Sequence, residues 1–124
     1  MWGYEQKTGI LRHNGQAVGT GYAGMDTATV MGKNNPAAEG IPDIGPLPQG
    51  GYSIGEAYHD PRLGPCAMRL TPDPANQMLG RSGFFIHADS IEHPGFASEG
   101  CIVLSSALRL MISTSNDARL QVVA

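Results

Sequence analysis

The sequence has little charge of either sign and no cluster of positive charge. Only 15% of its 124 residues are Asp, Glu, Lys or Arg, against about a quarter in an average globular domain. The 8 Lys and Arg residues are scattered singly, and the formal net charge is −3. Because nucleic acids are bound by clustered cations, this distribution argues against a nucleic-acid partner.

Long apolar runs are also missing. No stretch approaches the roughly 20 apolar residues that cross a membrane, and the first residues lack the apolar centre of a secretory signal. We therefore expect no membrane partner and a protein made in the cytoplasm without a signal peptide. If it acts elsewhere, a route other than general secretion must carry it there.

Cysteine is scarce, with only Cys66 and Cys101 in the chain. A chain of this length buries about two-thirds of its unfolded surface, so it needs no disulfide framework and is expected to form one domain over residues 1–124. The two cysteines have different flanks. Cys66 is expected to begin an apolar strand, whereas Cys101 follows the turn Ser98-Glu99-Gly100. Only Cys101 has the local features of a nucleophile.

What the sequence has in quantity is glycine and proline, 17 and 9 residues, which place much of the backbone in turns and loops. Asn14-Gly15 between two strand-like segments is a strong hairpin signal. Asn35 and Pro36 predict a short helical turn. A helix capped by Ser105 or Ser106 is expected next, because apolar residues recur at helical spacing at Leu104, Leu108, Met111 and Ile112. Further strands are expected at residues 52–54, 66–70, 83–87, 101–104 and 120–123. We predict a mainly β domain with one packed α-helix.

Two side chains that could act as a base and a nucleophile lie at the ends of predicted strands. His87 ends the apolar segment Phe84-Phe85-Ile86, and Cys101 follows Gly100, where unusual backbone angles and close approach of a substrate are possible. If the two strands are neighbours, the imidazole and the thiol can meet, and the imidazole can activate the thiol. The amides of Gly100 and Cys101 are then candidate oxyanion donors.

These residues carry a family resemblance. Ile86-His87-Ala88-Asp89 followed by Ser98-Glu99-Gly100-Cys101-Ile102 resembles the active-site signature of L,D-transpeptidases. More narrowly, the chain resembles the small L,D-transpeptidase-like effectors delivered by type VI secretion, which carry upstream elements similar to residues 32–40 and 45–54. The resemblance implies the β-sandwich of an L,D-transpeptidase catalytic domain, with the one helix packed on it.

Two positions depart from the typical cell-wall enzymes. Those enzymes have His where this chain has Glu99, and Arg where it has Val103. Both departures suit the effector branch, and the second leaves the details of donor binding open.

The resemblance implies an activity on peptidoglycan without a cofactor. Cys101 would attack the L,D-peptide bond between residue three and D-Ala of a tetrapeptide stem, with His87 as general base and the amides of Gly100 and Cys101 as oxyanion donors. Water would resolve the acyl-enzyme as an L,D-carboxypeptidase, and a D-amino acid would resolve it by exchange; both remain open. Such an effector would act in the periplasm of target bacteria, and a cognate immunity protein would protect the producer.

Three further residues are candidate substrate contacts. Asp89 either orients His87 or binds a substrate amine, and its alternative role is to cap its own loop. Ser98 either bonds within its turn or touches the substrate. His93 lies in the loop at the expected rim of the cleft.

Two other functions compete with the thiol mechanism. A zinc peptidase could use the donors His87, Asp89, His93 and Cys101. Metal binding does not require a Ser-x-Gly-Cys turn, however, and we expect no metal. The other alternative is a non-catalytic module that holds a peptidoglycan stem or a partner protein. Replacement of Cys101 by alanine separates the three: it abolishes thiol catalysis, leaves zinc binding partly intact and barely affects a binder.

Overall fold

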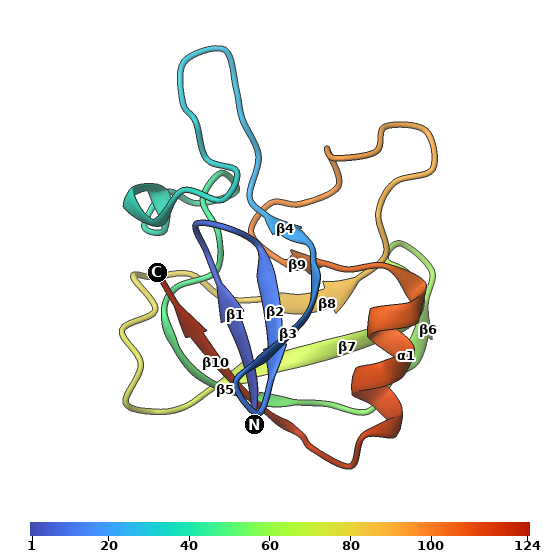
Figure 1. Ribbon diagram of the computed structural model, residues 1–124. Helices are drawn as coiled ribbons and strands as arrows, with labels where there is room; N and C mark the ends of the chain where they lie inside the picture. Colours follow the sequence, from blue (N-terminus) through green and yellow to red (C-terminus); the bar gives the residue numbers. More distant parts are fainter.

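Ten strands form one strongly curled sheet in the computed structural model, which describes residues 1–124 (Figure 1). The strands are β1 (Trp2–Glu5), β2 (Ile10–His13), β3 (Gln16–Thr20), β4 (Tyr22–Ala23), β5 (Gly50–Ile54), β6 (Tyr58–Asp60), β7 (Gly64–Pro72), β8 (Phe84–His87), β9 (Ile102–Val103) and β10 (Arg119–Val123). A 3-10 helix, η1 (Pro36–Ala38), and one α-helix, α1 (Ser106–Thr114), complete the fold. The expected mainly β architecture with one α-helix is confirmed.

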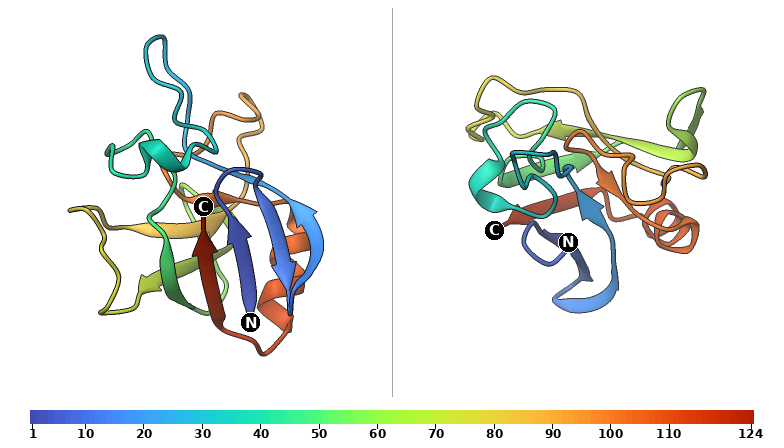
Figure 2. Two further views of the ribbon diagram at one scale, coloured as in Figure 1. Left: turned by 60° about the vertical axis from the view of Figure 1, so that its left-hand side comes forward. Right: turned by 90° about the horizontal axis from the view of Figure 1, so that it is seen from above.

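The sheet is nearly closed on itself. Its strand order is β3-β2-β1-β10-β5-β7-β8-β9-β4, with β6 paired to β7. The strands at the two ends of this order, β3 and β4, are consecutive in the chain, so the edges come together (Figure 2). The two layers expected of a sandwich are therefore opposite parts of one curled sheet. Two pairs are parallel, β1 with β10 and β8 with β9.

The predicted hairpin is confirmed. Asn14 and Gly15 have φ of 49° and 86°, which is the left-handed region that a tight hairpin turn requires. His13 pairs with Gln16 directly across that turn.

The strand before this hairpin, β1, was not expected from the sequence. Its residues Trp2 and Tyr4 are nevertheless 1% and 0% exposed and belong to the core.

The helix begins as predicted, because the Ser105 hydroxyl accepts a hydrogen bond from the Leu108 amide at 3.3 Å. Asn35 likewise caps the 3-10 helix, its side chain accepting from the Ala37 amide. The expected apolar face was wrong at Met111, which is 43% exposed. Arg109, a charged residue of the same helix, is buried. No helix of the structure has the length and apolar character that crossing a membrane requires.

The hydrophobic core holds the ends of the two strands that lie next to the predicted catalytic residues. Phe84 and Ile86 of β8 and Ile102 of β9 are all buried in one cluster of 17 residues. Their packing restricts His87, which follows the apolar residues of β8, and Cys101, which comes directly before β9.

Candidate active site

His87 and Cys101 lie on neighbouring strands and share a pocket. In the parallel pair of β8 and β9, His87 is opposite Val103 and Ile86 is opposite Ile102. Since side chains alternate between faces along a strand, Cys101, two residues before Val103, is placed diagonally from the imidazole. Both side chains line a pocket of about 300 Å³.

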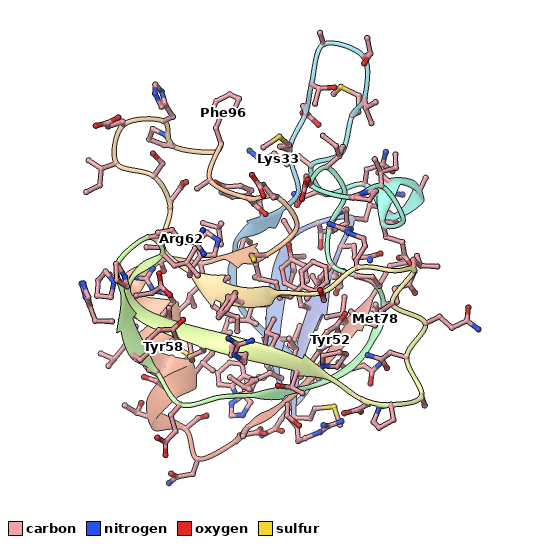
Figure 3. The ribbon with its side chains drawn as sticks, turned by 180° about the vertical axis from the view of Figure 1, so that it is seen from behind. Lys33, Tyr52, Tyr58, Arg62, Met78 and Phe96 are labelled. Atoms are coloured by element: carbon pink, nitrogen blue, oxygen red, sulfur yellow. The ribbon has the colours of Figure 1, made fainter.

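The rest of this pocket comes from loops. Arg62 and Leu63 come from the turn between β6 and β7, and Phe96 comes from the loop between β8 and β9. In Figure 1 the orange loop that carries Phe96 and the blue-to-cyan loop after β4 extend from the same end of the sheet. Figure 3 shows Arg62, Phe96 and Lys33 at this end.

The imidazole of His87 is oriented for use as a base. Its Nδ1 atom lies 2.7 Å from the carbonyl oxygen of Ala88. A carbonyl only accepts, so Nδ1 carries the proton and Nε2 keeps its lone pair. Burial lowers the pKa of His87, which is only 4% exposed, below the ordinary value of 6.5. His87 is therefore neutral at pH 7 and able to accept a proton at Nε2.

Cys101 is a free, half-buried thiol. Its Sγ atom lies 3.8 Å from the carbonyl oxygen of Gly83, and no hydrogen bond joins it to His87. Burial raises the pKa of Cys101 above the ordinary value of 9.0, although hydrogen bonding from the Phe85 amide opposes this shift. The resting pair is thus a neutral thiol beside a neutral imidazole, and hydrogen bonds of this kind often tighten only when substrate is bound.

Gly100 gives the nucleophile turn its shape. Its φ of 136° lies in a region that side chains disfavour. A Cβ atom at this position would lie 2.6 Å from Nη2 of Arg81 and 3.0 Å from the carbonyl oxygen of Gly45. The Gly100 carbonyl also accepts a hydrogen bond from the Leu47 amide at 2.9 Å. Only glycine fits here without displacing the surrounding chain.

Arg81 is a site residue that sequence reasoning missed. It is 8% exposed, and its guanidinium donates to four carbonyl oxygens, those of Glu39, Gly45, Pro46 and Glu99, at 2.7 to 3.0 Å. A lone arginine in a glycine-rich stretch belongs to no periodic pattern, so nothing in the sequence separated it from a solvated charge. It ties the segment around Gly45 to the turn that carries Cys101, and its charge acts to lower the pKa of that thiol.

Of the two roles expected for Ser98, the structure shows the hydrogen bonding within its own turn. Its side chain is 0% exposed. The hydroxyl donates to the carbonyl oxygen of Cys101 at 2.6 Å and accepts from the amides of Gly24 and Gly100 at 2.9 and 3.0 Å. These bonds use its full hydrogen-bonding capacity. Ser98 holds the turn in place and does not face the pocket.

The same bond corrects the expected oxyanion hole. The Gly100 amide donates to the Ser98 hydroxyl, so it does not point at a substrate oxygen. The Cys101 amide remains as the candidate donor, since it takes part in no backbone hydrogen bond of the structure. Gly100 therefore contributes through backbone shape.

Asp89 and His93 also lie away from the reacting pair. The Asp89 carboxylate accepts from the Tyr22 hydroxyl at 2.7 Å and from the amides of Ser90 and Gly95 at 2.8 and 3.1 Å. The alternative in which Asp89 caps its own loop is the one seen, and it makes no hydrogen bond to His87. His93 is exposed and does not line the pocket.

The four candidate zinc donors are not brought together. His87 and Cys101 share the pocket, but Asp89 is used by its loop and His93 points to solvent. No group of three or more His, Cys, Asp or Glu side chains is arranged to hold a metal ion. The residues present therefore do not fit the zinc peptidase alternative.

A second pocket of about 260 Å³ adjoins Cys101. Asp43, Ser82 and Phe84 line only this pocket, whereas Gly83, Glu99 and Cys101 border both pockets. The sulfur thus stands between two hollows of similar size, one beside the imidazole and one beside the segment around Asp43.

Comparison with known proteins is consistent with this arrangement. No curated protein matches the chain. The Tlde1 domain family matches residues 18–124. This range contains His87 and Cys101 and also the upstream elements at residues 32–40 and 45–54. Since this match spans most of the chain, the protein belongs to the Tlde1 domain family, whose members are L,D-transpeptidase-type effectors of type VI secretion that modify peptidoglycan.

Proposed function

We propose that residues 1–124 form one catalytic domain, a cysteine-dependent L,D-carboxypeptidase or L,D-transpeptidase that acts on tetrapeptide stems of peptidoglycan. The observation that carries the proposal is that Cys101 and His87 line one pocket, with Nε2 of the imidazole free. The family supplies the substrate class, because its members modify peptidoglycan.

The first half-reaction transfers the acyl part of the stem to sulfur. His87 Nε2 takes the thiol proton as Sγ of Cys101 attacks the carbonyl carbon of residue three, and a C–S bond forms. The developing oxyanion is stabilised by the Cys101 amide. The C–N bond then breaks, and the proton on Nε2 passes to the departing nitrogen of D-Ala. A thioester and free D-Ala result.

The second half-reaction returns the enzyme to its starting state. A water molecule, or the amine of another D-amino acid, gives a proton to His87 Nε2 and attacks the thioester carbon. The C–S bond breaks, and the proton returns to sulfur. Water yields a tripeptide stem, and a D-amino acid yields an exchanged tetrapeptide stem.

The biological setting follows from the family. We propose that the protein is secreted into the periplasm of target bacteria, where loss or alteration of tetrapeptide donors weakens the cell wall. A cognate immunity protein would protect the producing cell from this activity.

The test is release of D-Ala from a purified disaccharide-tetrapeptide, followed by mass spectrometry of the muropeptides. Cys101→Ala removes the nucleophile and should reduce release to background. His87→Ala should reduce it by about 10² to 10⁴-fold, the usual contribution of a general base. Cys66→Ala is the matched control, because Cys66 is a free thiol that contacts Ser113 and lies outside both pockets. It should retain the wild-type rate.

Adding a second D-amino acid to the same reaction separates hydrolysis from exchange by product mass. Unchanged release in Cys101→Ala would refute the thiol mechanism. A wild-type protein that binds stems but never releases D-Ala would instead point to the non-catalytic module.

A further inference from the structure

The two pockets beside Cys101 differ in the charged groups that they offer. The larger contains His87 and Arg62 together with apolar side chains. The smaller contains the carboxylate of Asp43 and the guanidinium of Arg81, which is mostly engaged by four carbonyl oxygens. Glu99 borders both. A peptide whose scissile carbonyl is placed at the sulfur must extend into one pocket with its acyl side and into the other with its leaving group. The charges of the pockets and the path of the catalytic proton together determine which pocket receives the leaving group.

Proton transfer fixes the direction, given the proposed function on which this inference rests. The departing nitrogen of D-Ala has to receive its proton from Nε2 of His87, so it must lie on the imidazole side of the sulfur. The α-carboxylate of D-Ala is two bonds away from that nitrogen and therefore enters the same pocket. A carboxylate there needs a cation that is not already paired.

Arg62 meets this need. It is exposed and stands in the turn between β6 and β7, which the Asp60 carboxylate shapes by accepting from the amides of Arg62 and Leu63 at 2.8 and 3.0 Å. Its guanidinium takes part in none of the side-chain hydrogen bonds or ion pairs of the structure. A free guanidinium binds a carboxylate through two parallel hydrogen bonds. Figure 3 shows Arg62 on the same side of the molecule as Phe96, the other loop residue of this pocket.

Other cations near this end are less suited. Lys33 lies over the ring of Tyr22, 4.3 Å from its centre, and donates to the Gly95 carbonyl at 3.4 Å. Arg81 lines the other pocket, and four of its five N–H donors already bind carbonyl oxygens. Arg62 is the cation that lines the imidazole-side pocket without a protein partner.

We propose that Arg62 binds the α-carboxylate of the D-amino acid that leaves, and of the D-amino acid that enters when exchange occurs. The second part follows because the entering amine must reach the thioester along the path by which D-Ala departs. Arg62 thereby selects stems that end in a free D-amino-acid carboxylate, and the acyl part of the stem occupies the pocket beside Asp43.

The test compares two substrates, a tetrapeptide stem ending in D-Ala and the same stem ending in D-Ala amide. Wild-type protein should prefer the carboxylate in kcat/KM by about 10-fold, a value typical of one charge-assisted contact at an exposed site. In Arg62→Gln this preference should disappear through a higher KM for the carboxylate stem, with the amide stem unaffected. Arg62→Lys should keep part of it. The preference should also shrink at high salt, because the contact is exposed.

Lys7→Gln is the matched control, since it removes one exposed positive charge outside both pockets and should leave the preference intact. The inference is overturned if Arg62→Gln keeps the wild-type preference, or if it slows both stems equally. Either result leaves Cys101-dependent release of D-Ala intact. Absence of that release in the wild type would instead overturn the proposed function itself.

Discussion

At the scale of single residues, the reacting pair rests in its uncharged form. Burial acts on both groups and disfavours the charged state of each: it lowers the pKa of His87 and raises that of Cys101. A preformed thiolate–imidazolium pair would require the opposite shifts. In the proposed mechanism the proton of the thiol therefore moves to Nε2 when the substrate carbonyl is attacked, and the carbonyl of Ala88 keeps the ring in the tautomer that can receive it.

This arrangement predicts the pH dependence of kcat/KM. Because the folded pKa of His87 lies below 6.5, the base stays active at pH 7 and activity should fall only as the pH drops below 6.5. The thiol ionises above pH 9.0, so the alkaline limit should lie above that value. Alkylation of Cys101 by iodoacetamide, measured in the Cys66→Ala variant, should rise steeply only at alkaline pH. Fast alkylation near pH 5 would reveal a thiolate pair and contradict this account.

At the scale of elements, the nucleophile turn is supported by chain segments far away in sequence. The segment 45–54 supplies the Gly45 carbonyl to Arg81 and the Leu47 amide to the Gly100 carbonyl. Ser98 joins the same turn to Gly24. These contacts give a physical reason why the upstream element accompanies the catalytic signature: without it, the turn that carries Cys101 loses its support.

Gly100→Ala tests this support. A left-handed backbone angle at a residue with a side chain costs about 1–3 kcal/mol, and the new methyl group would also collide with Arg81 and the Gly45 carbonyl. We expect a loss of at least about 2 kcal/mol in unfolding free energy, measured in urea, together with a loss of D-Ala release.

Gly15→Ala is the control for the strain alone. Gly15 also has a positive φ, of 86°, but a Cβ atom there meets nothing within 4 Å. It should lower stability by about 1 kcal/mol and leave the rate unchanged. Equal effects of the two substitutions on the rate would show that the packing around Gly100 is unimportant.

At the scale of the whole molecule, the first strand closes the sheet. β1 stands between β2 and β10, and Trp2 pairs with Leu120 near the other end of the chain. The indole of Trp2 stacks on His13 with ring centres 3.9 Å apart, and its nitrogen donates to the carbonyl of Asp117 at 3.1 Å. β1 lies outside residues 18–124, which the family comparison matches, yet it is part of the same core.

Trp2→Ala should therefore destabilise the fold as a whole. A fully buried tryptophan replaced by alanine costs about 3–5 kcal/mol, because apolar contacts are lost and a cavity remains. Ile91→Ala is the control, since Ile91 is 98% exposed and its removal should change stability by less than about 0.5 kcal/mol. A Trp2→Ala protein with the wild-type urea midpoint would show that β1 is dispensable.

Local patterns predicted much of the secondary structure correctly. Asn14-Gly15 turns a hairpin, Asn35 caps the 3-10 helix and Ser105 caps α1, because each of these effects depends on one or two residues and their own backbone. The prediction missed β1, whose strand character comes from its partners β2 and β10. It also placed Met111 on the buried face of α1, whereas Met111 is 43% exposed and Arg109 is buried.

The mainly β character, the capped helix and the positions of His87 and Cys101 at strand ends could all be predicted from the sequence, because they follow from local conformational preference and from residue chemistry. The roles of Ser98, Gly100 and Arg81 could be seen only in the folded chain. Each acts through hydrogen bonds or close contacts with residues distant in the chain, and such contacts leave no periodic trace in the sequence. The same reason applies to Arg62, which shares a pocket with His87 only because the curled sheet brings the β6–β7 turn beside the end of β8.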